Sequence, residues 1–192
     1  MNYSNNDNLL IQSYFTTALL VELKNAKFLD SDYYKNARFE DKFVQDNLPK
    51  VGIDNQGTLL MILYTLLVVP RQLLEKKFPS EFDDLNKVVV DLSTSATSSY
   101  KKDAQAIDHV PHLRNAVAHA RVNFAPDGTA SFRDEDGKGS VWEATFPLSN
   151  IGPLLTALQA IFMKYVESVK SGFRAWHTAN GQYSVYRELS RG

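Results

Sequence analysis

The run from Leu59 to Val69 constrains the fold of this chain more than any other feature of its sequence. Almost all of its residues are large and apolar, and Pro70 ends it. A helix that crosses a membrane needs about 20 apolar residues, so this run is too short to be one. A helix that is apolar on nearly every side belongs at the centre of a core. The run therefore predicts a buried helix from Leu59 to about Lys77, kinked or divided at Pro70.

The composition is that of a globular chain. Of the 192 residues, 44% are hydrophobic and 22% are charged, which suits one domain over residues 1–192. The net charge of -1 excludes binding of nucleic acid through the overall charge of the protein. If the chain binds nucleic acid, the basic groups that contact it must be gathered in one place. The absence of cysteine excludes disulfides, thiolate metal sites and cysteine nucleophiles. The start, Met1–Asp7, lacks the positive charge of a signal peptide, and we expect a soluble, cytoplasmic protein without membrane contact.

Apolar residues recur at helical spacing along most of the chain. Turn formers and capping residues mark where each helix begins and ends. The first predicted helix spans 8–29 and is capped by Asp7, and a short one lies within 32–48 and is broken by Pro49 and Gly52. A third begins with a capping box at Ser80–Asp83 and carries an apolar stripe to Leu92. The last is long, runs from Ser149 to Gly172 and has Pro153 in its first turn.

The spacing changes to period two between Val122 and Thr145, with turn signals at 126–128 and 136–139. This pattern predicts a two- or three-stranded meander inserted at 122–146, whereas the Ser/Thr-rich segment 93–99 favours a loop or a frayed helix end. Residues 173–192 form a C-terminal tail whose aromatic rings we expect to pack on the body. The predicted fold is therefore mainly α: a helical bundle with a small β-hairpin or meander before the last long helix.

The most informative motif lies in the segment from Asp108 to Arg121, which reads as a helix capped by Asp108. Its polar residues follow the pattern His112-x-Arg114-Asn115-x-x-x-His119. At about 100° per residue, His112, Asn115 and His119 fall on one stripe. The stem of Arg114 is long enough to reach back toward it. A polar stripe with no acidic partner nearby is costly to bury, so we expect it to face a cleft or a partner chain.

The segment Leu113–Ala120 resembles the HEPN superfamily (higher eukaryotes and prokaryotes nucleotide-binding domains), whose motif is Arg, a polar residue, a spacer and His. The motif spans six residues, and its place on a late helix, before one more long helix, matches the family along most of the chain. The resemblance implies an all-α bundle that forms a homodimer through the motif helices. It also implies a metal-independent endoribonuclease, without a cofactor, whose two motifs face one another. Arg114 and His119 then take the catalytic positions, with Asn115 at the polar position.

The residue types suit RNA cleavage without a metal ion. The reaction needs a proton acceptor for the 2′-hydroxyl, a proton donor for the leaving 5′-oxygen and a cation beside the phosphorane. His119 offers proton transfer near neutral pH, and Arg114 offers a planar fork for phosphate oxygens. Asn115 either orients His119 or binds phosphate. Two His119 side chains in a dimer would divide the acid and base roles.

The sequence departs from one subgroup of the HEPN superfamily at the position two residues after the motif histidine. A toxin subgroup of the family carries a tyrosine there, which a partner nucleotidyltransferase modifies, whereas this chain has Arg121. Arg121 is expected to extend a basic rim that binds RNA. A toxin–antitoxin or phage-defence role, with an antitoxin or nucleotidyltransferase partner, stays open. So does the alternative of a non-catalytic dimerisation or nucleotide-sensing module.

Several other polar residues have plainer interpretations. His112 is a candidate for an RNA contact, but a histidine at such a position more often satisfies a nearby carbonyl group. His109 is expected on the surface, and nothing connects His177 to the motif. Lys101 and Lys102 read as a solvated helix end. The acidic residues 134–136 precede a glycine and read as a turn, not as a metal site.

Overall fold

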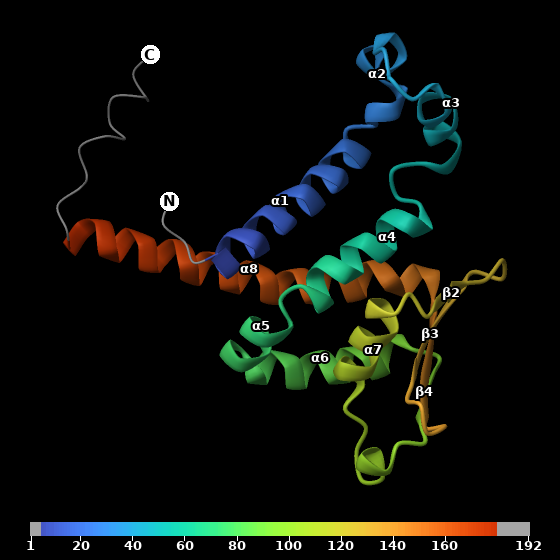
Figure 1. The fold of residues 1–192 in the computed structure, drawn as a ribbon, viewed down its shortest axis with the longest axis vertical. Helices are drawn as coiled ribbons and strands as arrows, with labels where there is room; N and C mark the ends of the chain where they lie inside the picture. The colour runs from blue at the N-terminus through green and yellow to red at the C-terminus, as the bar shows by residue number, and fades with distance from the viewer. Residues whose placement is uncertain (1–4, 180–192) are drawn as a thin grey trace.

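The last helix of the chain is also its longest described element, and helices from the middle of the chain pack against it (Figure 1). The computed structural model describes the backbone of residues 5–179 and the side chains of residues 9–70 and 74–169. The described helices are α1 (Asn5–Asn25), α2 (Asp32–Asn36), α3 (Lys42–Val51), α4 (Gln56–Leu63), α5 (Arg71–Lys77), α6 (Pro79–Leu92), α7 (His109–Ala118) and α8 (Leu148–Ala179). The predicted fold class, mainly α with a small sheet before the last helix, is confirmed.

The apolar run divides at the predicted place, but it is buried on one side only, because Met61 and Tyr64 are exposed. After α4, residues Tyr64–Val68 form a π-helical turn, in which the backbone N–H of Val69 donates to the carbonyl of Tyr64 at 3.2 Å. Pro70 then stands at the N-cap of α5, where its missing N–H leaves no helical hydrogen bond broken. The buried leucines of this segment are Leu63, Leu66 and Leu67.

In the described part of the chain, no single helix is long and apolar enough to cross a membrane. The helix α3 and the segment Gln56–Val68 reach the required length and apolar content together, but they meet at a bend of 87°. Gly52 ends α3 there with a φ of 78°, a backbone conformation that favours glycine. Pro49 was expected to end this helix, but it lies inside it.

The sheet has one strand more than the meander predicted. Its strands are β1 (Ser95–Ser98), β2 (Val122–Phe124), β3 (Thr129–Glu135) and β4 (Val141–Pro147), antiparallel in the order β1-β4-β3-β2. The interpretation of residues 93–99 as a loop or frayed helix end is wrong, because Ser95 pairs with Thr145 and Ser98 with Trp142. This edge strand is built from serine, threonine and alanine, so it carries no alternation of large apolar residues that would identify it.

One face of the sheet is buried against the helices. Figure 1 shows α6, α7 and α8 on the same side of the strands. The buried positions alternate with exposed or half-buried ones along β3 and β4, as expected of strands with one covered face. The residues that suggested the period, such as Ser131 and Glu143, belong to the outer face. The buried face presents Ala130, Phe132, Asp134, Trp142, Ala144 and Phe146.

Helices α6 and α8 pack against each other and close the core beside the sheet. The stripe predicted on α6 is confirmed, since Leu85 and Val89 are buried. The predicted capping box is not formed, because the hydroxyl of Ser80 donates to the neighbouring Glu81 carboxylate at 2.8 Å. The last helix, α8, starts at Leu148, one residue before the predicted cap Ser149. The prediction that Gly172 ends it is wrong, because its backbone continues to Ala179.

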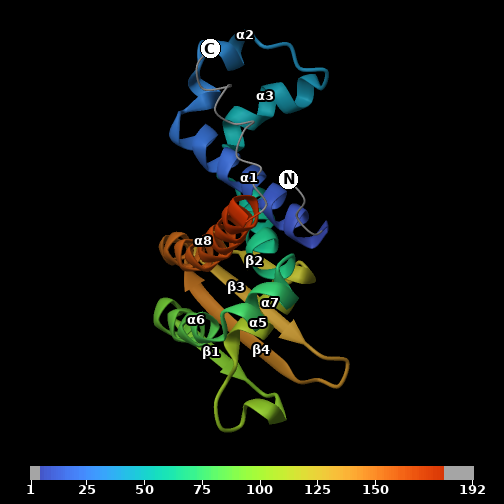
Figure 2. The ribbon, with the colours of Figure 1, turned by 90° about the vertical axis from the view of Figure 1, so that its left-hand side faces the viewer.

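The helices α1 to α3 extend away from the sheet (Figure 2). α1 begins at Asn5, so Asp7 lies inside the helix and does not cap it as predicted. The ring of Tyr14 stacks on Phe162 of α8 at 5.5 Å between centroids, which ties α1 to the core. At the far end, the segment predicted as one short helix forms α2 and α3, and Phe43 on α3 is 75% exposed.

The two phenylalanines Phe132 and Phe43 give a matched test of this architecture. Phe132→Ala should lower the free energy of unfolding by about 3–5 kcal/mol, because the ring is fully buried between sheet and helices. Phe43→Ala removes the same atoms from an exposed site and should change it by about 0.5 kcal/mol or less. Urea unfolding of both variants measures the difference; equal effects would contradict the proposed core.

Candidate active site

The start of α7 is held by a side chain from α6. Asp108 occupies the predicted N-cap position, but its carboxylate accepts no hydrogen bond from the helix backbone. The side chain of Asn86 bridges the two instead: its Nδ2 donates to Asp108 Oδ1 and its Oδ1 accepts from the backbone N–H of Val110, both at 2.9 Å. The cap of the motif helix is therefore supplied from a distant part of the chain.

The motif helix ends earlier than predicted, at Ala118. The backbone N–H of Arg121 donates to the carbonyl of Ala116 at 2.8 Å, and Ala120 adopts a left-handed φ of 52°. These are the features of a Schellman C-cap, in which Ala120 occupies the position that usually carries glycine. His119 is the C-cap residue and lies exposed at the helix end. Arg121 leaves the helix and leads into β2.

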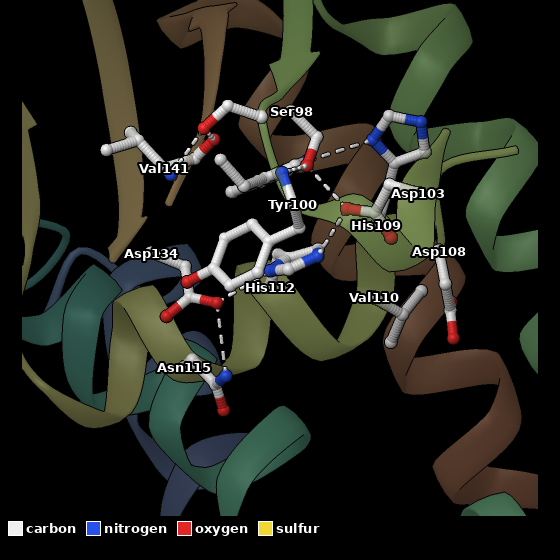
Figure 3. A network of polar contacts seen from close by, with 12 residues as sticks. Ser98, Tyr100, Asp103, Asp108, His109, Val110, His112, Asn115, Asp134 and Val141 are labelled. Carbon is white, nitrogen blue, oxygen red and sulfur yellow. Dashed lines mark hydrogen bonds and ion pairs between the residues drawn. The ribbon is translucent and has the colours of Figure 1, made fainter. Parts of the chain in front are cut away.

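His112 lies in the interior between two carboxylates (Figure 3). Its Nδ1 is 2.6 Å from Asp134 Oδ2 and its Nε2 is 2.9 Å from Asp103 Oδ2, and the ring is 1% exposed. Asp103 also accepts from the hydroxyl of Ser98 on β1. The expectation that the polar stripe has no acidic partner is therefore wrong. In the described chain, His112 is also shielded from the direct RNA contact for which it was a candidate.

Aromatic rings close the two faces of His112. Trp142 stacks on the imidazole with 5.6 Å between centroids and 13° between planes, and Tyr100 lies at 4.6 Å on a tilted plane. Each ring nitrogen can donate to the ionised carboxylate beside it when it carries a proton. An imidazolium held this way has charge-assisted bonds on both sides and aromatic faces above and below. The arrangement thus suits a structural cation.

His109 is buried beside this group, and its expected place on the surface is wrong. The indole N–H of Trp142 donates to His109 Nδ1 at 3.2 Å. Burial lowers the pKa of His109, and the charge of His112 lowers it further. His109 therefore serves as a neutral acceptor that orients the tryptophan.

Arg114 points to a different element from the other motif residues. Its guanidinium Nη1 donates to Glu75 Oε2 on α5 at 3.1 Å, and the residue is 7% exposed. Glu75 is half-buried and also lines a cavity of about 400 Å³ together with Asp83 and Asp108. The motif arginine is thus nearly buried and partly neutralised in the single chain.

Asn115 and Arg121 are bonded to two neighbouring residues of β3, Asp134 and Glu135. The amide Nδ2 of Asn115 donates to Asp134 Oδ2 at 3.2 Å. The guanidinium of Arg121 donates to the backbone carbonyl of Glu135 at 3.0 Å and lies 3.5 Å from its carboxylate. Asp134 and Glu135 were expected in a turn, but both belong to β3, and only Asp136 lies in the turn. The basic rim expected at Arg121 is accordingly paired with acid.

The structure therefore brings His112 and Asn115 together through Asp134, and directs Arg114 toward α5. Within the residues whose side chains are described, no hydrogen bond or ion pair engages the His119 ring. The sequence reading missed Asp103, Asp134 and Glu75. One signal was available: Asp134 continues the period of Ala130 and Phe132, which places a carboxylate on the buried face. Among the described residues there is no group of three or more His, Asp or Glu arranged to hold a metal ion.

Comparison with known proteins gives one family match. The family model described as HEPN pEK499 p136 matches residues 1–169, which include the whole motif helix and the sheet. No curated protein and no solved structure matches the chain significantly.

Tyr100 provides a test of the packing around His112. Burial, followed by the charges of Asp134 and Asp136, raises the pKa of Tyr100 from about 10 to about 12. The unfolded chain then ionises first, so the free energy of unfolding should fall as the pH rises from 10 toward 12. Tyr100→Phe has no phenol to ionise, so its free energy of unfolding should not show this fall. Measured by urea unfolding, the stability of the variant relative to the wild type should therefore rise from pH 10 to pH 12. Parallel pH curves for the two proteins would show that the phenol is not buried beside acid.

Proposed function

The chain belongs to the HEPN family, and we propose that it is a metal-independent endoribonuclease in which Arg114, Asn115 and His119 act at one site. HEPN domains are commonly ribonucleases, which makes RNA the first substrate to test. The observation that carries the proposal is the exposed His119 at the end of the motif helix, five residues after Arg114. An imidazole accessible to solvent is the group that such a reaction needs for proton transfer.

The reaction follows from the groups at this site. One imidazole takes the proton of the 2′-hydroxyl, and the 2′-oxygen attacks the adjacent phosphorus. The bond from phosphorus to the 5′-oxygen breaks as a second imidazole protonates that oxygen, leaving a 2′,3′-cyclic phosphate and a 5′-hydroxyl. The guanidinium of Arg114 stabilises the extra negative charge of the phosphorane. None of these steps uses a metal ion or a cofactor.

Arg114 must change partners for this to happen. A guanidinium binds a carboxylate and a phosphate with the same planar fork, so an RNA phosphate can replace Glu75. Arg121 is likewise paired with Glu135 and would contact RNA only by exchange. With a net charge of -1, RNA binding is then confined to these few basic groups and weakens as the salt concentration rises.

One chain supplies one motif histidine, whereas the reaction uses an acid and a base. We therefore propose a cytoplasmic homodimer, formed through the motif helices, in which the two His119 side chains divide these roles. Such a nuclease would suit a toxin–antitoxin or phage-defence system, held in check by an antitoxin or a nucleotidyltransferase. Arg121 replaces the tyrosine at which partners modify the toxin subgroup, so control in this chain would use another residue.

Removing either motif residue should abolish cleavage. Arg114→Ala and His119→Ala should each lower kcat/KM on single-stranded RNA by about 10²-fold or more, since each removes a group that acts in the transition state. Arg133→Ala, an exposed arginine on β3, is the matched control and should stay active. Cleavage that survives both motif substitutions would refute the assignment and favour the non-catalytic alternative, a dimerisation or nucleotide-sensing module.

A site shared between two subunits predicts that an inactive subunit lowers the activity of the wild-type subunit paired with it. Subunits carrying His119→Ala, exchanged in excess into the wild-type protein, should lower the activity per wild-type chain, because each mixed dimer lacks one of the two imidazoles. Exchange with Arg133→Ala subunits controls for dilution. The measurement is the RNA cleavage rate at fixed wild-type concentration, with dimer formation followed by light scattering. An unchanged rate per wild-type chain would mean that each protomer works alone.

A further inference from the structure

We propose that His109 is an acid-sensitive catch for the motif helix: its neutral ring holds Trp142 in place, and uptake of a proton by the ring releases the indole and loosens the start of α7 from the sheet. The catch is a property of the fold and does not rest on the proposed nuclease activity. It is formed by the first residue of α7, at the end of the helix opposite to His119.

The first step concerns the protonation state that the contact requires. The indole N–H of Trp142 can only donate, and it lies 3.2 Å from His109 Nδ1. That nitrogen must therefore carry no proton, so the neutral ring has its proton on Nε2. An imidazolium carries a proton on both nitrogens, and a charged His109 would set one N–H against another. The contact exists only while His109 is neutral.

The second step is that the two rings are too confined to turn away from such a conflict. Trp142 is 0% exposed and His109 is 6% exposed. The indole is also stacked on the ring of His112, with 13° between the planes. A buried N–H that loses its acceptor finds no water to replace it, and this costs free energy. Relief therefore requires the packing of β4 on α7 to open.

The third step is the balance of charges around His109, which lies next to Asp103 (Figure 3). The carboxylates of Asp103, in the 3₁₀ turn before α7, and of Asp108, at its cap, favour a proton on the ring. β4 contributes the neutral indole, and α6 contributes the neutral amide of Asn86. Burial opposes the proton most strongly, and the neighbouring His112 adds to it. The net result is a lowered pKa for His109.

The direction of the pH effect follows from this lowered pKa. A histidine in an unfolded chain has a pKa of about 6.5, which is above that of His109 in the folded protein. Below about pH 6.5 the unfolded chain therefore binds more protons at this position, and the free energy of unfolding falls as the pH decreases. Through this one group, the unfolding constant can rise by at most about tenfold for each pH unit.

The main experiment compares the wild type with His109→Asn in urea unfolding between about pH 7.5 and pH 5.5. Asparagine places an oxygen acceptor near the position of Nδ1 and takes up no proton in this range. The ratio of the wild-type unfolding constant to that of the variant should rise about threefold or more as the pH falls, because only the wild type gains a proton here on unfolding. A ratio that does not change with pH would overturn the proposal.

Two further variants complete this comparison. His119→Asn, at the exposed end of the same helix, is the matched control, and its ratio should stay nearly constant because an exposed ring can be protonated in both states. His109→Gln guards against misfolding of the asparagine variant. It is also neutral and carries an acceptor, so it should remove the same part of the pH dependence. A pH dependence that His109→Gln leaves as large as in the wild type would count against the catch.

Release of the indole is measured separately, by acrylamide quenching of tryptophan fluorescence. The chain has two tryptophans, so a Trp176→Phe background leaves Trp142 as the reporter. Its quenching constant should be about 1.5-fold or more higher at pH 5.0 than at pH 7.5, and His109→Asn on the same background should remove the increase. Equal quenching at the two pH values, in protein that circular dichroism shows to be folded, would refute the release. Neither measurement uses RNA, so both results stand whether or not the protein is a nuclease.

Discussion

A buried imidazole bonded to two carboxylates joins the motif helix to the sheet. His112 contacts Asp134 of β3 on one side and Asp103 of the 3₁₀ helix Lys101–Asp103 on the other. Buried ionic groups are costly unless each is fully paired, and removal of one partner typically costs about 3–5 kcal/mol. The helix α7 can therefore take only the orientation that satisfies both contacts. The placement of Asn115 and of the helix end at His119 follows from this constraint.

The sequence predicted those parts of the fold that depend on local pattern. The apolar run and Pro70 predicted the divided core segment, and period-two spacing predicted the strands 122–146. The edge strand β1 cannot be predicted from the sequence because its small polar residues have no periodic signal. The sequence predicts too late an end for α7 because an alanine at position 120 gives no sign of a left-handed conformation.

The partners of the motif could not be predicted from the same kind of pattern. Asp134 is 22 residues from His112, and Glu75 is 39 residues from Arg114. Periodicity identifies the buried face of an element but not the residue that meets it from another element. Asp134 was also obscured by the turn that follows it, since an acidic run before glycine is typical of a turn. Only the continued alternation from Ala130 and Phe132 pointed to its burial.

The two ends of the motif are in different environments. Arg114 is nearly buried against Glu75, whereas His119 is exposed at the end of the helix. The resting chain therefore has the proposed proton-transfer group accessible and the proposed phosphate-binding group occupied by a carboxylate. A ligand that binds the guanidinium must have a greater affinity for it than the carboxylate does, and this competition disfavours weakly held anions.

The order of these residues along the chain has a consequence during synthesis. Asn115 precedes its carboxylate partner by 19 residues, and Trp142, which packs on the shared histidine, is made later still. A ribosome-bound fragment that already contains His112 and Asn115 still lacks the β3 carboxylate that contacts both of them. Order at the motif is therefore acquired late in translation, when the hairpin of β3 and β4 closes over α7.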